Sequence, residues 1–238
     1  MNNITIGITD CGRYNNYADW IKAATGVEVV KLSYHNNNFS ILQQCNGIVL
    51  TGGQDVHPRY YNRMEYMELY KGALPDIDAK RDDFEWRVLD YSQQKNLPVL
   101  GICRGLQIAN VFFGGTLVFD IPALGKRDHA KIKEGEDRYH SISVTPGSAL
   151  EKITRTDTGI VNSAHHQSAL KVAENLVVAA VSEEGVIEAL ERKDFDDHPY
   201  LMLVQWHPER MIDQQSVFSL YIKNSLLDAV KQSQQVRL

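Results

Sequence analysis

The sequence predicts a three-layer α/β fold with a central, mostly parallel β-sheet. Short apolar runs of strand length alternate with amphipathic helix-length segments along the first half of the chain, which is the pattern of parallel sheets covered by helices. The second half instead carries short β-like runs, which predict additional antiparallel strands. The length of 238 residues suits one domain with a core of ordinary size.

The first half should form the parallel part of the sheet. In chain order we expect a strand at Ile4–Thr9, a helix at Tyr14–Thr25, a strand at Val27–Leu32, a short helix at Phe39–Gln44 and a strand at Gly47–Leu50. The first helix has apolar residues three and four positions apart, and a glycine follows it. This β-α-β-α-β order predicts a flavodoxin-like arrangement, in which ligands bind beyond the carboxyl ends of the strands.

A long connection, Thr51–Pro75, leads to the centre of the sheet, and connections of this length are often functional. A helix at about Asp78–Lys95 follows, with an acidic start that suits the helix dipole. The apolar segment Val99–Ile102 should be a central strand, and the helix after it should end at Gly114-Gly115.

The second half begins with a polar, irregular stretch at Asp120–Asp137. Antiparallel strands are expected after it, because Glu184-Gly185 lies between two β-like runs as a hairpin turn would. A helix at about Gln214–Val230 should close the fold, and the polar tail Lys231–Leu238 should fray. The expected β-like runs are His140–Val144, Gly159–Asn162, Leu176–Val181, Val186–Leu190 and Tyr200–Gln205.

Composition excludes several classes of function. The formal net charge is −5 and no run of Lys or Arg stands out, so nucleic acid is not expected as a partner. No apolar run is long enough to span a membrane, and Met1–Thr5 lacks the features of a signal peptide, so we expect a cytoplasmic protein. The sparse cysteines, Cys11, Cys45 and Cys103, indicate a reducing compartment, with Cys11 and Cys45 structural. The sequence leaves open whether two copies of the chain form a homodimer.

The strongest functional signal is the turn after the strand at Val99–Ile102. Gly101 and Gly105 stand two positions before and after Cys103, which is the thiol counterpart of the Gly-x-Ser-x-Gly nucleophile elbow. Only residues without a Cβ fit the crowded backbone of such a turn. The helix start would direct partial positive charge at the sulfur and favour the nucleophilic thiolate. A lone cysteine in an apolar strand is usually structural, but these glycines favour a nucleophile.

A base and an orienting group are present in Gln205-Trp206-His207-Pro208-Glu209. His207 would take the thiol proton, and Glu209 would hold the other ring nitrogen. Pro208 stiffens the turn between them, so that both side chains can point the same way. A lone histidine would more often be an exposed loop residue, but the elbow upstream favours a catalytic triad of Cys103, His207 and Glu209.

Glycines after the third strand offer backbone donors. Gly52-Gly53 permits positive φ and exposes N–H groups, although the dipeptide alone would favour an ordinary turn. An oxyanion hole needs two such donors near the nucleophile. We predict the amides of Gly53 and Arg104 for this role.

The polar segment Asn162–Gln167 follows a strand and suits substrate contact or loop hydrogen bonding. Metal binding by His165 and His166 together is disfavoured, because adjacent residues on a strand point to opposite faces. We therefore expect no metal and no other cofactor. The remaining histidines are expected to be surface or structural residues: His35, His57, His129, His140 and His198.

Four segments together resemble the class I glutamine amidotransferase family, which uses a Cys-His-Glu triad on an α/β sheet. They are Gly52–Pro58, Gly101–Gln107, Asn162–Gln167 and Gln205–Glu209, and they occur in the family's order over most of the chain. Within the family the chain is most similar to the stand-alone γ-glutamyl hydrolases, especially the γ-glutamyl-γ-aminobutyrate hydrolase type.

The resemblance implies a single domain over residues 1–238 with a small γ-glutamyl molecule as substrate. It implies that Cys103 is the nucleophile, that His207 is base and acid, and that Glu209 orients His207. It also implies that Gly53 and Arg104 donate their amides. The side chains expected to contact the substrate are Gln107, Asn162, Ser163, His165 and His166.

The implied reaction is hydrolysis of a γ-glutamyl amide through a thioester, which releases glutamate and an amine. Two other functions stay open. A glutaminase subunit that supplies ammonia to a partner synthetase would use the same acyl-enzyme, but no segment resembles a synthetase domain. A non-catalytic binding protein of the same fold is the third function, and the intact triad argues against it.

Overall fold

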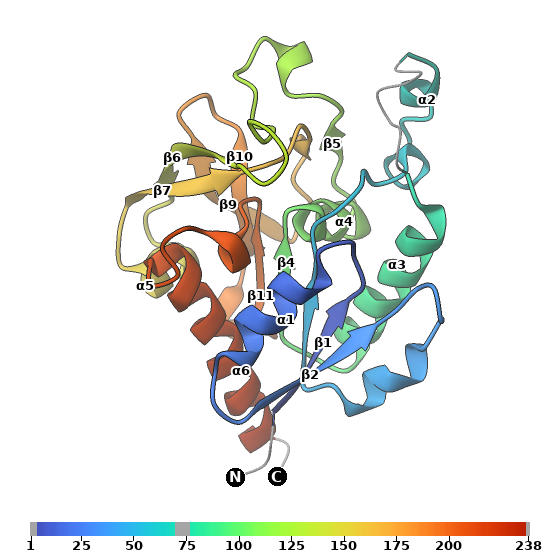
Figure 1. Ribbon diagram of the computed structural model, residues 1–238, viewed down its shortest axis with the longest axis vertical. Coiled ribbons are helices and arrows are strands. Elements are labelled where there is room, and N and C mark those ends of the chain that lie inside the picture. The colour runs from blue at the N-terminus through green and yellow to red at the C-terminus, as the bar shows by residue number, and fades with distance from the viewer. Residues whose placement is uncertain (1–3, 70–76, 237–238) are drawn as a thin grey trace.

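The computed structural model describes residues 4–69 and 77–236, and within them one large mixed sheet forms the centre of the molecule (Figure 1). Its strands are β1 (Ile4–Thr9), β2 (Val27–Leu32), β3 (Gly47–Leu50), β4 (Val99–Ile102), β6 (Arg138–Val144), β7 (Thr158–Ser163), β9 (Leu176–Ser182), β10 (Ile187–Arg192) and β11 (Leu201–Val204). They lie in the order β2-β1-β3-β4-β11-β10-β9-β6-β7.

The sheet has a parallel and an antiparallel half that share β11. Strands β2, β1, β3, β4 and β11 run parallel to one another. From β11 onward, β10, β9, β6 and β7 alternate in direction. The predicted α/β class is therefore confirmed, together with the predicted antiparallel elements and the hairpin at Glu184-Gly185, where Gly185 has a φ of +72°.

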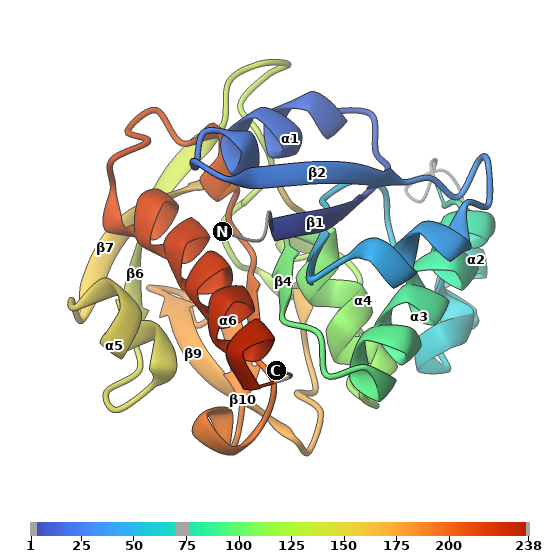
Figure 2. The same ribbon diagram turned by 90° about the horizontal axis from the view of Figure 1, so that it is seen from below.

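Helices cover both faces of the sheet, and two apolar clusters fill the spaces between the layers (Figure 2). Side chains of α1 (Tyr14–Lys22), α5 (Ala149–Thr154) and α6 (Ile222–Val236) pack in one cluster. Side chains of α3 (Ala79–Gln94) and α4 (Arg104–Phe112) pack in the other. Because the central strands are covered on both faces, β3 and β4 are entirely buried, which explains their continuous apolar sequences.

The long connection after β3 contains a 3₁₀ turn at Pro58–Tyr61 and a short helix, α2 (Glu65–Leu69). Residues 70–76 of this connection lie outside the described part of the chain. Two further short strands, β5 (Leu117–Val118) and β8 (Ser168–Ala169), pair in an antiparallel way beside the main sheet.

The bounds of the first and last helices of the chain differ from the sequence prediction. The first helix ends at Lys22 rather than Thr25, because the chain leaves it for a turn in which Gly26 has a φ of +76°. At the C-terminus, a π-helical turn at Val217–Tyr221 precedes α6, which continues to Val236. The expected fraying from Lys231 is wrong for residues 231–236, because Val230 is fully buried and Lys231 pairs with Asp228 one turn earlier.

None of the helices found in residues 4–69 and 77–236 has the length and apolar character needed to cross a membrane.

Candidate active site

Cys103 lies in the sharp turn between β4 and α4, at the carboxyl edge of the parallel strands (Figure 1). Its backbone adopts a φ of 53° and a ψ of −106°, which is strained for a residue with a side chain. A Cβ on Gly105 would lie 2.4 Å from the Leu50 carbonyl oxygen, and one on Gly101 would lie 2.8 Å from the Gly105 carbonyl oxygen. The predicted strand-to-helix elbow is therefore confirmed, and close backbone approach explains both glycines.

His207 and Glu209 follow the end of β11, the strand beside β4. Nδ1 of His207 lies 3.0 Å from Oε1 of Glu209, and both residues are buried. Because an ionised carboxylate only accepts, Nδ1 carries a proton and the other ring nitrogen is left for Cys103, with which the ring hydrogen-bonds. A Cβ on Gly52 would lie 2.9 Å from Cε1 of His207 and 3.4 Å from Cβ of Cys103, so three distant segments meet here.

The surroundings of His207 favour its charged form. Burial alone would lower the pKa of His207, but the Glu209 carboxylate and the Cys103 sulfur raise it to about 9. At neutral pH a positively charged ring therefore lies beside the sulfur. This is the kind of microenvironment in which cysteines act as thiolate nucleophiles.

Two backbone amides belong to segments that adjoin Cys103, because Gly53 follows Gly52 and Arg104 follows Cys103. Gly53 has a φ of +149°, and a Cβ there would lie 2.1 Å from Nη1 of Arg81. Arg104 begins α4 directly after Cys103. In residues 4–69 and 77–236, no acceptor receives the N–H of either Gly53 or Arg104, so both amides can still bind a developing oxyanion.

Arg81 of α3 fixes the loop that carries Gly53. Its buried guanidinium donates to the carbonyl oxygen and hydroxyl of Thr51 at 3.1 and 3.0 Å, and to the Gly52 carbonyl oxygen at 2.9 Å. It also donates to Oε1 of Gln54 at 3.2 Å. These bonds leave the loop little freedom, so Arg81 determines where the Gly53 amide lies.

Arg81 belongs to a buried, charge-balanced cluster with Asp82, Glu85 and Arg104. Nε of Arg81 lies 2.9 Å from Glu85, and the Arg104 guanidinium pairs with both Asp82 and Glu85. Burial would raise the pKa of Glu85, but Arg104 and Arg81 hold it below its usual value. Since the Arg104 side chain is tied to α3, the cluster also fixes the Arg104 amide beside Cys103.

Sequence reasoning missed this cluster of charged residues. Its signal was present in the sequence, because Arg81 and Glu85 share the helix face of the apolar Phe84 and Val88. Charged side chains on the buried face of a helix are rare unless they are paired.

Two of the predicted substrate residues are buried beside the triad. Nε2 of Gln107 donates to the Gln167 carbonyl oxygen at 3.1 Å. Oδ1 of Asn162 accepts the backbone N–H of His207 at 3.0 Å, and its Nδ2 donates to Asp137 at 2.9 Å. The Asn162 side chain therefore helps to position His207 by binding the backbone of that histidine. A contact of either residue with substrate stays a prediction.

The other predicted substrate residues of this segment, Ser163, His165 and His166, lie in different surroundings. The Ser163 hydroxyl donates to the His129 carbonyl oxygen at 2.6 Å. His165 is buried and its Nδ1 lies 2.9 Å from the Gln167 carbonyl oxygen. The expectation that His165 and His166 point apart is confirmed, although both follow the end of β7 rather than lying on the strand.

His166 is the most accessible member of the predicted substrate set. Its side chain is 35 % exposed, and its Nε2 lies 3.0 Å from Asp55 while its Nδ1 lies 3.4 Å from Asp120. The hydrogen bond to Asp55 raises the pKa of His166. His166 thus connects the C-terminal half to the loop of Gly53.

The sequence profile of the peptidase C26 family matches residues 8–209, which include every residue of this site. The chain belongs to the peptidase C26 family. Proteins of this family resemble class I glutamine amidotransferases, so the resemblance noted in the sequence is confirmed.

The proteins to which this chain is similar carry two kinds of description. A glutamine amidotransferase-like protein of Lactococcus lactis is 37% identical over 185 residues, covering 77% of this chain and 74% of the relative. A γ-glutamyl-γ-aminobutyrate hydrolase of Escherichia coli is 29% identical over 231 residues, covering 88% of this chain and 87% of the relative. A Thermoplasma acidophilum structure described as a candidate GMP synthase component superposes with a TM-score of 0.72 at 17% identity, covering 100% of this chain and 98% of its own, which shows the common fold.

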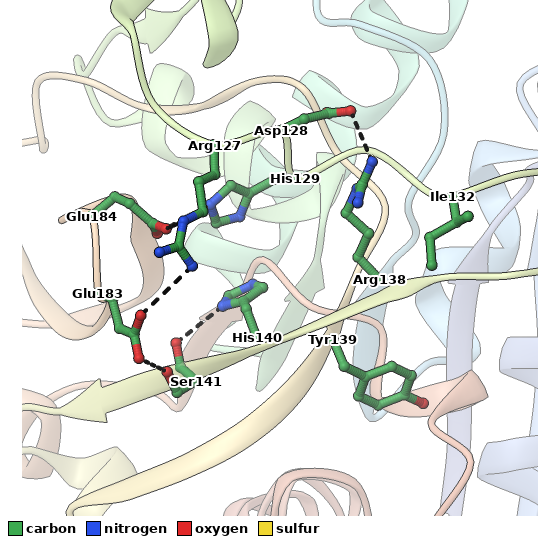
Figure 3. A pocket seen from close by; sticks show the side chains of 10 residues that line it. All are labelled: Arg127, Asp128, His129, Ile132, Arg138, Tyr139, His140, Ser141, Glu183 and Glu184. Atoms are coloured by element: carbon green, nitrogen blue, oxygen red, sulfur yellow. Dashed lines mark hydrogen bonds and ion pairs between the residues drawn. The ribbon is translucent and has the colours of Figure 1, made fainter.

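A second cluster of titratable side chains lies outside the triad. Ligand atoms of His129, His140, His165 and Glu188 all lie within 4.8 Å of one another, and three of these four residues are buried. His129 and His140 also line a cavity of about 590 Å³ that includes none of the triad residues (Figure 3). These four residues have the donor types that could hold a transition metal.

The other two cysteines lie outside the triad, although Cys11 hydrogen-bonds to Thr51. Both Cys11 and Cys45 are free thiols. Burial raises the pKa of Cys45 to about 12, and burial also raises the pKa of Cys11. Both side chains therefore stay protonated at neutral pH, in agreement with their predicted structural role.

Proposed function

We propose that this chain hydrolyses γ-glutamyl amides, with Cys103 as nucleophile, His207 as base and acid, and Glu209 as the group that orients His207. The observation that carries the proposal is the convergence of these three side chains at one edge of the sheet, where the segments that contain the Gly53 and Arg104 amides adjoin Cys103. A thiol, a base and an orienting carboxylate in this order are what covalent acyl transfer requires.

In the first half of the reaction, the Cys103 thiolate attacks the carbonyl carbon of the γ-amide. The carbonyl oxygen becomes an oxyanion, which the N–H groups of Gly53 and Arg104 stabilise. The C–N bond then breaks, and the His207 imidazolium gives its proton to the departing amine. A γ-glutamyl thioester and a neutral imidazole remain.

In the second half, water attacks the thioester carbonyl carbon. His207 takes a proton from the water, the same two amides hold the second oxyanion, and the C–S bond breaks. Glutamate leaves, and the thiolate and imidazolium are restored. The pKa of about 9 for His207 suits this cycle, because the ring is charged at neutral pH before it acts as the acid.

The accessible His166 supports recognition of a charged γ-glutamyl group at this edge. It lies between Asp55 and Asp120, so cationic and anionic groups adjoin one another there. The α-amino and α-carboxylate groups of a γ-glutamyl substrate require partners of both signs. We assign this recognition to His166 and its two carboxylate neighbours.

The purified chain, tested alone, provides the direct experiment. γ-Glutamyl-γ-aminobutyrate and glutamine are offered separately, and released glutamate is measured for the wild type and for Cys103→Ser. We expect turnover of the γ-glutamyl amide without any partner protein, and none with the serine variant. Activity on glutamine alone, and only after a partner is added, would overturn the hydrolase assignment.

The fold likeness to a candidate GMP synthase component supports one competing function, an ammonia-producing glutaminase. A γ-glutamyl chloroketone separates both catalytic functions from a binding protein. Covalent labelling at Cys103, detected by mass spectrometry, is expected for a catalyst of either kind. An unlabelled Cys103 would favour the binding protein.

A further inference from the structure

A cluster of three histidines and one glutamate lies outside the proposed catalytic triad. His129 comes from the irregular segment before β6, His140 from β6, His165 from the turn after β7, and Glu188 from β10. The side chain of Glu188 is fully buried, and those of His129 and His165 are 3 % and 2 % exposed. Four segments that are distant in sequence thus direct nitrogen and oxygen atoms into one small space.

Within residues 4–69 and 77–236, the atoms that face this space have no hydrogen-bond partners. These are Nδ1 of His129, Nε2 of His140, Nε2 of His165 and both carboxylate oxygens of Glu188. The Glu188 carboxylate has only long contacts, of 3.3–3.5 Å, with the three rings, and native proteins rarely leave several buried polar atoms together without well-formed hydrogen bonds. A bound cation would compensate all of them at once.

The outer nitrogens of two rings fix the protonation of the inner ones. Nδ1 of His165 lies 2.9 Å from the Gln167 carbonyl oxygen, and Nδ1 of His140 lies 3.1 Å from the Ser141 carbonyl oxygen. A carbonyl oxygen only accepts, so each Nδ1 carries the proton and each Nε2 points a lone pair into the cluster. Histidines that bind metals are held in this way.

His129 faces the cluster with its Nδ1, and its outer Nε2 lies near a carboxylate but beyond hydrogen-bond distance. Its Nε2 lies 3.7 Å from Oε2 of Glu184, and its Nδ1 faces Glu188. The ring centroids of His129 and His140 are 4.6 Å apart, so the rings are neighbours without stacking face to face.

The three distances from Glu188 are close to those of tetrahedral coordination, and all four ligand atoms lie within 4.8 Å of one another. Oε1 of Glu188 lies 3.3 Å from Nδ1 of His129, 3.5 Å from Nε2 of His140 and 3.5 Å from Nε2 of His165. Tetrahedral zinc, with bonds of about 2.0–2.1 Å to nitrogen and oxygen, places its ligand atoms about 3.3–3.4 Å apart.

We propose that His129, His140, His165 and Glu188 bind one Zn²⁺ ion in a structural site. Three imidazoles favour zinc or a similar first-row ion over Mg²⁺ or Ca²⁺, which prefer oxygen. Four protein ligands complete a tetrahedron and leave no position for a reacting water, so the ion serves the fold rather than the chemistry. This proposal replaces the expectation of no metal made from the sequence.

The ion would fasten the irregular segment before β6 to the sheet. The His129 carbonyl oxygen already accepts from the His165 backbone N–H at 3.0 Å and from the Ser163 hydroxyl. Asn162, at the end of β7 and three residues before His165, holds the backbone of His207. The cavity that His129 and His140 line gives the ion a path from solvent (Figure 3).

Metal analysis of the untagged protein provides the first test. The chain is stripped with a chelator and titrated with zinc chloride against a chromophoric competitor. We expect one Zn²⁺ per chain with a dissociation constant of about 10⁻⁷ M or tighter. Zinc should also raise the thermal unfolding midpoint of the stripped protein.

Two ligand variants and one control make the test specific. His140→Ala and Glu188→Gln should weaken zinc binding at least about 100-fold and remove the rise in unfolding midpoint. His140 is only half-buried, so its variant should still fold. His198→Ala, which removes an exposed histidine remote from the cluster, should bind like the wild type.

Two results would overturn the proposal. One is a wild-type chain that takes up no zinc at micromolar concentration, which would leave the cluster as a metal-free histidine–carboxylate network. The other is undiminished binding by both ligand variants. Neither result depends on γ-glutamyl hydrolysis, so the zinc site and the proposed function fail or stand separately.

Discussion

Replacing Glu209 by glutamine should change how the stability of the protein depends on pH. The Glu209 carboxylate is the main group that raises the pKa of the buried His207 to about 9, against the lowering effect of burial. A group whose pKa is raised on folding stabilises the fold at pH values below its ordinary pKa of about 6.5. That stabilisation is lost as the pH rises through about 9.

The size of the effect follows from the two pKa values. A change from 6.5 to about 9 corresponds to a stabilisation of about 3 kcal/mol, at about 1.4 kcal/mol for each pKa unit. In Glu209→Gln the lowering effect of burial is no longer opposed by this carboxylate. We therefore expect the difference in unfolding free energy between wild type and variant to shrink by about 2–3 kcal/mol from pH 6 to pH 9.5.

Urea unfolding at fixed pH values between 6 and 9.5 measures this difference directly. Glu174→Gln, which changes an exposed glutamate, serves as the matched control and should retain the wild-type pH dependence. The same variants report on catalysis, because Glu209→Gln should move the alkaline limb of the activity profile to lower pH. A wild-type-to-variant difference that stays constant over this range would refute the assignment of Glu209 as the partner of His207.

Three further substitutions test the rest of the site. Cys103→Ser should reduce γ-glutamyl hydrolysis at least about 1000-fold and change the unfolding free energy by less than about 1 kcal/mol; retained turnover would exclude Cys103 as nucleophile. Gly53→Ala places a Cβ 2.1 Å from Nη1 of Arg81 at a φ of +149°, so the free energy of unfolding should fall by about 1–3 kcal/mol. Displacement of the Gly53 amide should lower kcat about 100-fold, and an unchanged kcat would exclude this amide as a donor. Arg81→Lys keeps the charge but loses the planar fork, so kcat should fall about 10-fold with little change in KM; a change in KM alone would mean that Arg81 does not position the oxyanion donors.

The parallel half of the fold was predictable because its signals are local. The bounds of β1, β2 and β3 agree with the sequence prediction, since each is a short run rich in β-branched and other apolar residues between polar or glycine-containing turns. The turn at Cys103 was predictable for a different reason. Only glycine tolerates the backbone contacts that Gly101 and Gly105 make, so the presence of both glycines in the sequence predicts the tight turn.

The features that were not predicted depend on contacts between distant residues. The sequence predicts an ordinary helix around Arg81. The neighbouring residues do not indicate that its guanidinium contacts Thr51 and Gly52, which lie about thirty positions earlier in the chain. The sequence pattern indicates a surface or structural role for His129, whereas its partners lie on β6, β10 and the turn after β7. In both cases the element is identified but its neighbours are not, because hydrophobic periodicity reports burial and not polar partners.

Cys103 belongs to the parallel half of the sheet, but part of its surroundings comes from the antiparallel half. The end of β7 and the turn after it supply these contacts. Asn162 holds the backbone of His207, His165 points into the histidine cluster, and His166 reaches Asp55 on the loop of Gly53. The short segment of residues 162–166, at the end of β7 and just after it, thus contacts the base, the proposed zinc site and the loop with the proposed oxyanion donor. Release of zinc should therefore loosen His207 and Gly53 together, and stripped protein should lose kcat while Cys103 remains in its rigid elbow and still reacts with a small thiol reagent.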